Sequence, residues 1–141
     1  MMNHAGSPKI FHRIAARVID YVVISAVGAG IGVAIGFGFV WLLLTALLVF
    51  GYFVVGDVAA GTTLGKAALG LRVEGPSGSQ PALGAALARE AFVLLGAVPF
   101  AGPLLALVAW VSLFVTIRGN PLGQGWHDRW AGGTRVVRKI A

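Results

Sequence analysis

The sequence predicts an all-α membrane protein with two transmembrane helical hairpins, four short helices in all, and three observations support this prediction. The 141 residues are 57% hydrophobic and only 11% charged, whereas a soluble domain carries about 25% charged residues. No Asp, Glu, Lys or Arg occurs in residues 21–56 or 91–117. The charges gather at the ends of these apolar stretches. We therefore expect lipid around most of the chain and polar chemistry at one membrane surface.

The first apolar stretch is too long for one crossing of about 20 residues. The run Gly36-Phe37-Gly38 divides it into a helix over about 8–35 and a second helix over about 39–56. Ser7 fits the N-cap of the first helix and Pro8 its first position. The apolar core of a secretory signal has only about 7–15 residues, so we interpret this stretch as retained membrane structure.

Small residues repeat every four positions along the first predicted helix, at Gly28, Gly32 and Gly36. This spacing allows a second helix to approach closely. The pattern is compatible both with packing inside one chain and with dimerisation.

The second apolar stretch has more than one interpretation. Either residues 91–117 form one long span, or a turn at residues 99–103 separates helices over about 82–98 and 104–117. With two hairpins, all eleven Lys and Arg residues lie on one side of the membrane, as the positive-inside rule favours. A re-entrant pair of helices gives the same distribution. We therefore predict two hairpins with both termini in the cytoplasm.

Residues 57–81 and 118–141 form the predicted cytoplasmic layer. Thr62 or Thr63 can begin a short helix there. Residues 71–74 and 134–138 alternate as short strands do and are candidates for a two-stranded ribbon. An isolated ribbon is marginally stable, so we expect it to pack on the membrane helices.

The run from Gly61 to Lys66 superficially resembles a phosphate-binding loop. That pattern requires four residues between its glycines and Ser or Thr after the Lys. Here three residues separate Gly61 from Gly65, and Ala67 follows the Lys. We therefore predict no nucleotide site, and expect Lys66 to meet lipid phosphate or a carboxylate.

Arg17 and Asp20 lie on one face of the first helix, with Asp20 about one turn inside the apolar stretch. Carboxylates at this depth are costly and face a partner or a water-filled cavity. The two residues form either a titrating or cation-binding site, in which Arg17 steers Asp20, or a structural ion pair. Arg89, in the third predicted helix, either balances Asp20 or Asp128 or reaches out to the headgroups.

A second polar cluster, His127 and Asp128, lies between Trp126 and Trp130. His127 is a candidate proton shuttle near neutral pH, and Asp128 is a candidate second acid beside Asp20. The alternative is a hydrogen-bonded turn that anchors the C-terminal segment. With no Cys in the chain and no second His in this cluster, we predict no metal site. No catalytic constellation is visible, so we expect neither enzyme activity nor a cofactor.

In their order and spacing, these clusters resemble the RDD family of bacterial membrane proteins over about residues 10–138. The resembling segments are Ala16-Arg17-Val18-Ile19-Asp20, Thr63-Leu64-Gly65-Lys66, Leu69-Gly70-Leu71-Arg72-Val73, Arg89, His127-Asp128 and Ala131-Gly132-Gly133-Thr134. Leu64 replaces a frequent Pro, and Gly133 is an extra residue. The resemblance implies that Arg17, Asp20 and Asp128 are the arginine and the two aspartates that name the family. It also implies a multi-pass protein of the bacterial inner membrane, with transport as the expected role.

Two functions are compatible with these features. One is a small transporter of a cation or proton, in which Asp20 titrates, Arg17 and Arg89 tune it, and Asp128 is a second acid. Four short helices scarcely enclose a pathway, so this function requires a homo-oligomer or a partner. The other is a non-transporting accessory protein that binds anionic headgroups through its basic face, with a purely structural Arg/Asp set. The net charge of +6 fits cytoplasmic loops, so we expect lipid and no nucleic acid as a partner.

Overall fold

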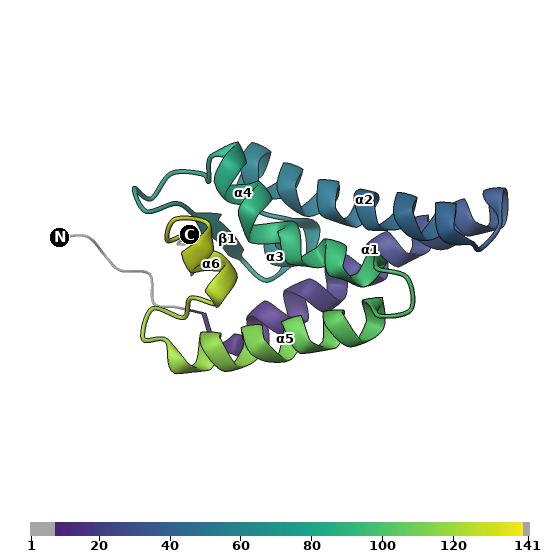
Figure 1. Cartoon of the computed structure of the whole chain (residues 1–141). Helices are drawn as coiled ribbons and strands as arrows, with labels where there is room; N and C mark the ends of the chain where they lie inside the picture. Colours follow the sequence, from purple (N-terminus) through teal and green to yellow (C-terminus); the bar gives the residue numbers. More distant parts are fainter. Residues whose placement is uncertain (1–7, 140–141) are drawn as a thin grey trace.

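A long antiparallel helical hairpin dominates the computed structural model, which describes residues 8–139 (Figure 1). It consists of α1 (Ile10–Ile35) and α2 (Phe39–Val55), and α2 continues as a π-helical turn, η1 (Gly56–Ala60). Ser7, the predicted N-cap, lies outside the described residues. The first helix begins at Ile10 rather than at about residue 8. Gly36 ends it with a φ of 87°, a conformation that glycine adopts without steric cost.

Gly28 and Gly32 of α1 serve packing within the chain. An added Cβ at Gly28 would lie 3.0 Å from Thr45 Cγ2 of α2, and at Gly32 it would meet the ring of Phe37. Trp41 Nε1 donates a hydrogen bond to the Gly28 carbonyl oxygen at 2.8 Å. These contacts hold α2 against α1.

The second hairpin is shorter and less regular. Its outward arm is α4 (Leu83–Glu90), which passes directly into the 3-10 helix η2 (Ala91–Ala97), and its return arm is α5 (Gly102–Gly119). An added Cβ at Gly102 would meet the carbonyl oxygen of Gly96, so the turn requires a residue without a side chain. Figure 1 shows that the η2–α5 turn stops well short of the tip of the α1–α2 hairpin.

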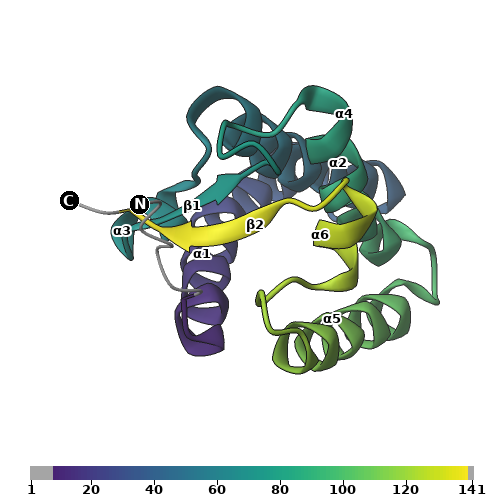
Figure 2. The ribbon, with the colours of Figure 1, turned by 90° about the vertical axis from the view of Figure 1, so that its left-hand side faces the viewer.

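A polar layer covers one end of the bundle, which we call the polar end. It contains α3 (Leu64–Ala68), β1 (Leu71–Glu74), α6 (Trp126–Trp130) and β2 (Arg135–Arg138). The strands pair antiparallel, with Leu71 opposite Arg138 and Glu74 opposite Arg135, which confirms the predicted ribbon. Figure 2 shows β2 running across this end of the helices. Leu71, Val73 and Val136 pack on Ala16 of α1, so the ribbon is supported as expected.

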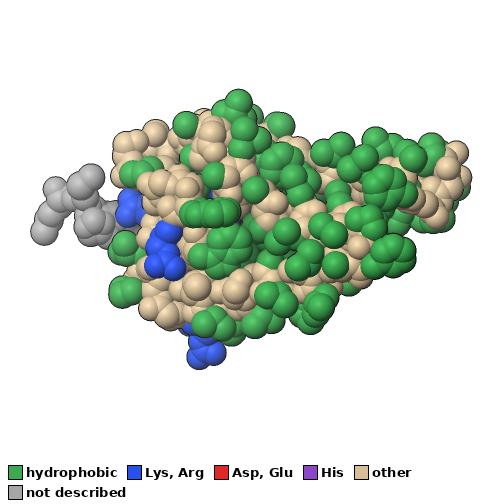
Figure 3. Space-filling model, in the orientation of Figure 1, with side chains coloured by type: hydrophobic (Ala, Val, Ile, Leu, Met, Phe, Trp, Pro, Cys, Tyr) green, Lys and Arg blue, Asp and Glu red, His purple; other side chains and the backbone are tan. Residues whose placement is uncertain are grey.

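Three helical segments are long and apolar enough to cross a membrane, namely Ile10–Ile35, Phe39–Ala60 and Gly102–Gly119. The visible surface is largely hydrophobic, and the visible Lys and Arg side chains lie toward the polar end (Figure 3). The fold is thus mostly helical, with three candidate spans and a two-stranded sheet. A fourth crossing by α4 and η2 stays a prediction, beside the re-entrant alternative.

The apolar core joins the two hairpins through η2. One cluster contains Ile24, Val49 and Phe53 of the first hairpin. A second contains Phe92, Ala109 and Leu113 of the second hairpin. Val93 of η2 packs against both clusters. By contrast, α1 and α5 lie apart where they approach the polar end (Figure 2).

Candidate functional site

Eight charged side chains meet inside the polar end, and we call them the ion network. They come from five elements: α1, η1, α3, α4 and α6. Four of the five acidic residues of the chain belong to it, and all four are fully buried. The members are Arg13, Arg17, Asp20, Asp57, Lys66, Arg89, Glu90 and Asp128.

Arg89 is the centre of the ion network. Its Nε donates to Asp128 Oδ1 at 2.7 Å, and its Nη1 donates to Asp57 Oδ2 at 2.5 Å and to Glu90 Oε1 at 3.3 Å. Only 2% of the residue is exposed, so it does not reach out to the headgroups. Of its two expected partners, Arg89 contacts Asp128 and does not pair with Asp20.

One of the two alternatives predicted for Arg17 and Asp20, a structural ion pair between them, is wrong. Arg17 Nη2 donates instead to Glu90 Oε2 of α4 at 2.7 Å. The two side chains lie on one face of α1, but different elements pack against them. An added Cβ at Gly65 would meet the carbonyl oxygen of Ala16. Thus α3 packs directly on α1 at this level, and the Gly65 N–H of α3 donates a hydrogen bond to the carboxylate of Asp20.

Asp20 is held by uncharged donors from two elements. Its Oδ1 accepts hydrogen bonds from the Tyr52 hydroxyl and from the Gly65 N–H, both at 2.7 Å. Its Oδ2 accepts one from Thr63 Oγ1 at 2.6 Å. No Lys or Arg of residues 8–139 forms an ion pair with it. Asp20 is therefore the one carboxylate of the ion network without a cationic partner.

Four members of the ion network, Arg13, Asp57, Lys66 and Glu90, are not among the predicted site residues. Asp57 is the first charged residue after the 21–56 stretch, and Glu90 is the last before the 91–117 stretch. Their position at these boundaries is the signal that would have singled them out. Lys66 Nζ donates to Asp57 Oδ1 at 2.7 Å, so of the two partners predicted for Lys66, lipid phosphate or a carboxylate, the structure shows the carboxylate. Burial lowers the pKa of Lys66, although Asp57 opposes this.

Asp128 anchors α6 to the rest of the polar end. It accepts hydrogen bonds from Arg89, from Arg13 Nη2 at 3.1 Å, from Thr134 Oγ1 at 3.2 Å and from the Gly125 N–H at 3.1 Å. Burial alone would raise its pKa, but the nearby cations, Arg89 foremost, hold the pKa well below its usual range. Asp128 is therefore ionised at neutral pH.

His127 lies beside the ion network without joining it. Its Nε2 is 3.8 Å from Asp128 Oδ1, beyond hydrogen-bond distance. Its Nδ1 is buried and has no hydrogen-bond partner among the described residues. Burial lowers the pKa of His127 well below 6.5, so the imidazole is neutral at pH 7. The proton-shuttle role predicted for His127 remains a prediction.

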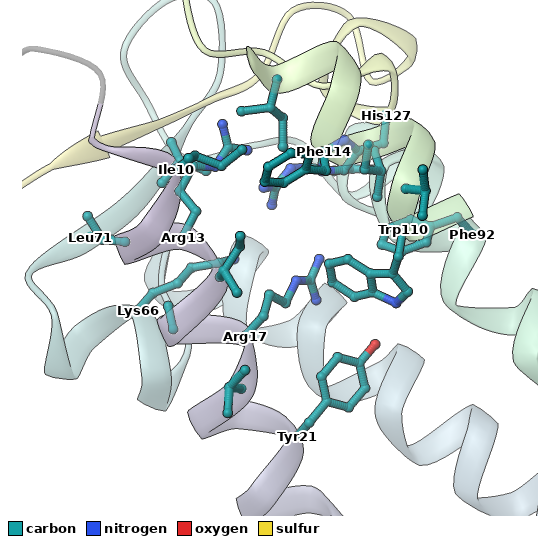
Figure 4. Close-up of a pocket in the computed structure, with 18 residues that line it drawn as sticks. Ile10, Arg13, Arg17, Tyr21, Lys66, Leu71, Phe92, Trp110, Phe114 and His127 are labelled. Carbon is teal, nitrogen blue, oxygen red and sulfur yellow. The ribbon is translucent and has the colours of Figure 1, made fainter. Parts of the chain in front are cut away.

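A cavity of about 460 Å³ opens between α1 and α5, directly against the ion network (Figure 4). We call it the α1–α5 cavity. Side chains of Arg13, Arg17, Lys66 and Arg89 line it, and none of the described carboxylate side chains does. Its apolar lining includes Val18 and Val111, each 55% exposed. The mouth of the cavity therefore faces the surface that lipid would cover.

The ion network balances in charge, but its two signs are unevenly placed about the α1–α5 cavity. Its four cations pair with three carboxylates, those of Asp57, Glu90 and Asp128. The fourth carboxylate, that of Asp20, is held by neutral donors. The cations line the cavity and none of the described carboxylate side chains does, so the structure concentrates positive charge on one wall.

Arg17 is the residue of this wall best placed to bind something more. Its Nη1 is buried and makes no hydrogen bond to the described residues. The guanidinium carbon lies 3.8 Å from the ring centroid of Phe53 and 5.7 Å from that of Trp110, within the range of cation–π attraction. Figure 4 shows the side chain extending from α1 into the cavity toward Trp110.

The side chains of the ion network that line the α1–α5 cavity are cations, which are suited chemically to an anion. Residues 8–139 contain no group of three His, Asp or Glu side chains placed to hold a metal ion. The buried carboxylates already accept hydrogen bonds from Lys, Arg and neutral donors, whereas the cations face the cavity.

Comparison with known proteins identifies the chain at the level of its family. No curated protein and no solved structure matches it. The model of the RDD family matches residues 7–132, a range that contains Arg17, Asp20, Arg89 and Asp128. Together with three helices able to span a bilayer, this match shows a multi-pass membrane protein that belongs to the RDD family.

Proposed function

We propose that this protein binds an anionic amphiphile, a lipid with a phosphate or carboxylate head, in the α1–α5 cavity. The observation that carries this proposal is the cavity wall itself, where four cations meet three carboxylates beneath a mouth lined by exposed valines. In this proposal the ion network is the scaffold that holds Arg17 and Arg13 toward the ligand.

Electrostatics favours an anion at this wall. Four cations and no described carboxylate line the cavity, and this arrangement attracts a phosphate or carboxylate. The unpartnered Nη1 of Arg17 supplies a donor, and the planar guanidinium matches both anions in geometry. A zwitterionic head would bring its own cation to a wall that four cations already line.

The apolar part of the cavity favours a ligand that arrives from the bilayer. Ile14, Val18, Val111 and Phe114 line it, and each is at least 39% exposed. A lipid can enter between α1 and α5 with its chain in contact with these side chains throughout. A small soluble anion would gain nothing from them.

We propose that the protein lies in a bacterial inner membrane, with the polar end and both termini on the cytoplasmic side. The positive-inside rule supports this orientation, because the Lys and Arg residues flank the apolar stretches. The cytoplasmic leaflet is rich in anionic lipid, so the proposed site would face the leaflet that contains its ligand.

Binding can be measured on the purified protein in nanodiscs of phosphatidylcholine, titrated with phosphatidic acid and counted by native mass spectrometry. We expect saturable binding of the anionic lipid.

The test variant combines Arg17→Met with Glu90→Gln, which removes an ion pair without leaving a lone buried charge. It should weaken binding of the anionic lipid about tenfold or more, because charged hydrogen bonds to the ligand are lost. Arg118→Met, on α5 but outside the cavity lining, is the matched control. Equal binding by the paired variant and the wild type would refute the proposal.

Transport of a cation or proton is the second candidate, and Asp20 favours it. Asp20 is fully buried and has no cationic partner among residues 8–139. The Tyr52 and Thr63 hydroxyls donate hydrogen bonds to it. This role requires an oligomer or a partner to complete a pathway. Liposome flux assays comparing wild type with Asp20→Asn test it, and absence of flux in every proton and cation gradient would exclude it.

A further inference from the structure

We infer that the hydrocarbon chain of the bound amphiphile passes Tyr21 and Trp110 and ends in a second cavity deeper in the bundle. This inference rests on the proposed function and adds where the ligand's chain lies. The second cavity has a volume of about 270 Å³ and lies between α1, α2, η2 and α5. None of its lining residues is charged: they are Tyr21, Trp41, Leu42, Thr45, Ala46, Val49, Phe92, Val93, Gly96, Ala97, Ala106 and Trp110.

Three aromatic residues belong to both cavities. Tyr21, Phe92 and Trp110 line the α1–α5 cavity and also the second cavity. The Tyr21 and Trp110 rings meet edge to face with centroids 6.0 Å apart, and Phe92 meets Trp110 at 5.5 Å. The two cavities therefore share an aromatic wall formed by these three side chains. In this inference, rotation of the rings joins the two spaces.

The order of residues along α1 matches the order of parts in an amphiphile. Arg13, Arg17 and Tyr21 all line the α1–α5 cavity. Successive residues at this spacing lie on one helix face, about one turn of 5.4 Å apart. The face of α1 thus changes from cationic to aromatic with distance from the polar end. Beyond Tyr21 lies the second cavity, whose lining residues are uncharged and mostly apolar. An anionic head beside Arg17 places its chain next to Tyr21.

The second cavity suits a hydrocarbon chain better than any polar occupant. Cavities with apolar walls stay dry and accept hydrocarbon ligands, and the atoms lining a void lack the dispersion contacts that a filled site provides. A chain from the first cavity would supply these contacts. The continuity of the two spaces thus selects for ligands with a long alkyl chain.

Trp41 provides a local probe of the second cavity. It lines that cavity but not the α1–α5 cavity, and its hydrogen bond to Gly28 fixes the indole in place. The experiment uses the full chain with Phe at Trp110, Trp126 and Trp130. Nanodiscs of phosphatidylcholine are titrated with a fatty acid brominated near its chain end, and Trp41 fluorescence is recorded beside native mass spectrometry of bound fatty acid.

The filling variant is Gly96→Leu, with Gly30→Leu as its control. Gly96 lines the second cavity, and an added Cβ would have ordinary contact with Ala106. Gly30 is an exposed position of α1 with nothing near an added Cβ. We expect Trp41 quenching that saturates together with binding, loss of the saturable quenching in Gly96→Leu, and no loss in Gly30→Leu.

The alternative outcomes separate this inference from the proposed function. The fatty acid could bind saturably and yet quench Trp41 no more than brominated phosphatidylcholine does. This result would overturn the inference and leave the proposed function standing. The same holds if Gly96→Leu is quenched as strongly as Gly30→Leu. Absence of saturable binding in the unsubstituted protein would overturn both.

Discussion

Arg17 donates to Glu90 of α4 at 2.7 Å, while Asp20, one turn further along the same helix, accepts its hydrogen bonds from α2 and α3. The two residues therefore fasten α1 to different parts of the molecule. Arg17 connects it to the second hairpin and borders the α1–α5 cavity. Asp20 connects it to the segment that follows α2. Substitutions at the two positions should consequently have separable effects.

Asp20→Ala should destabilise the protein far more than Asp20→Asn. Alanine leaves the Gly65 N–H and the Thr63 hydroxyl without their acceptor, and each unsatisfied buried group costs about 1–3 kcal/mol. Asparagine keeps one oxygen for Gly65 and Tyr52, and its amide can donate to the Thr63 hydroxyl oxygen. Thermal unfolding in detergent measures the difference. Equal losses in the two variants would show that the negative charge, rather than the hydrogen bonds, holds α3.

Gly65→Ala should prevent the close approach of α3 to α1. The added Cβ would meet the carbonyl oxygen of Ala16 and lie 2.9 Å from Asp20 Cγ, and this backbone cannot move without breaking the hydrogen bond to Asp20. We expect a loss of about 1–3 kcal/mol, typical of overpacking. Gly84→Ala is the control, because it lies in α4 with nothing near an added Cβ, and it should be neutral or stabilising. A neutral Gly65→Ala would contradict the observed packing.

Arg89→Met should be among the most damaging single changes in the chain. It leaves Asp57, Glu90 and Asp128 without their shared cation in a buried setting, and breaking buried ion pairs costs about 3–5 kcal/mol. Arg89→Lys should not restore stability, because one ammonium cannot reproduce the geometry of the guanidinium donors.

Arg72→Met is the matched control for Arg89. Arg72 pairs with Glu74 on the ribbon, but its side chain is 46% exposed, and exposed pairs contribute about 0–1 kcal/mol. Unfolding temperatures in one detergent, compared with the wild type, measure both changes. Similar losses for Arg72→Met and Arg89→Met would contradict the central role of Arg89.

The charge pattern of the sequence predicts the hairpins, but it does not predict which charged residues of the ion network pair with one another. Gly36 and Gly38 mark the first turn because only a polar or flexible break divides so long an apolar run. The Arg17–Asp20 pair fails because helical spacing identifies a shared face, not the partner that covers it. Asp57, Lys66 and Arg89 meet only after three separate segments pack at one end. Their pairing is set by tertiary contacts and has no local sequence signal.

The α1–α5 cavity is likewise invisible in the sequence. Val18 and Val111 read as ordinary membrane-helix residues, because apolar side chains look alike whether they face lipid, another helix or a cavity. The cavity exists because η2 lies between α5 and α2, while α1 packs on α2 and α3. Only the relative placement of the hairpins reveals it.

Acid should destabilise the protein through His127 before it affects the carboxylates. Burial lowers the pKa of His127 well below 6.5, so the folded protein keeps the ring neutral, while the unfolded chain binds a proton below pH about 6.5. The free energy of unfolding therefore falls as the pH drops below 6.5, by at most about 1.4 kcal/mol per pH unit. Above that pH both states are neutral and this contribution is constant.

Unfolding temperatures of wild type and His127→Gln at pH 7.5 and 5.5 isolate the contribution of His127. The variant should lose less stability between the two pH values than the wild type. Asp128 adds nothing in this range, because its pKa is held well below its usual range. An identical loss in the two proteins would mean that His127 is not buried in its neutral form.

The path of the second hairpin can be decided by single-cysteine labelling, since the natural chain contains no Cys. Ser77 and Arg138 lie at the polar end, Gly38 in the turn between α1 and α2, and Phe100 in the turn between η2 and α5. A membrane-impermeant maleimide applied to intact cells should label Gly38→Cys and not Ser77→Cys or Arg138→Cys.

If α4 and η2 cross the membrane fully, Phe100→Cys should be labelled as fast as Gly38→Cys, because Phe100 is fully exposed. The shorter reach of this turn in Figure 1 favours the re-entrant path, for which we expect Phe100→Cys to be labelled from neither side. Labelling of Arg138→Cys from outside would overturn the orientation altogether.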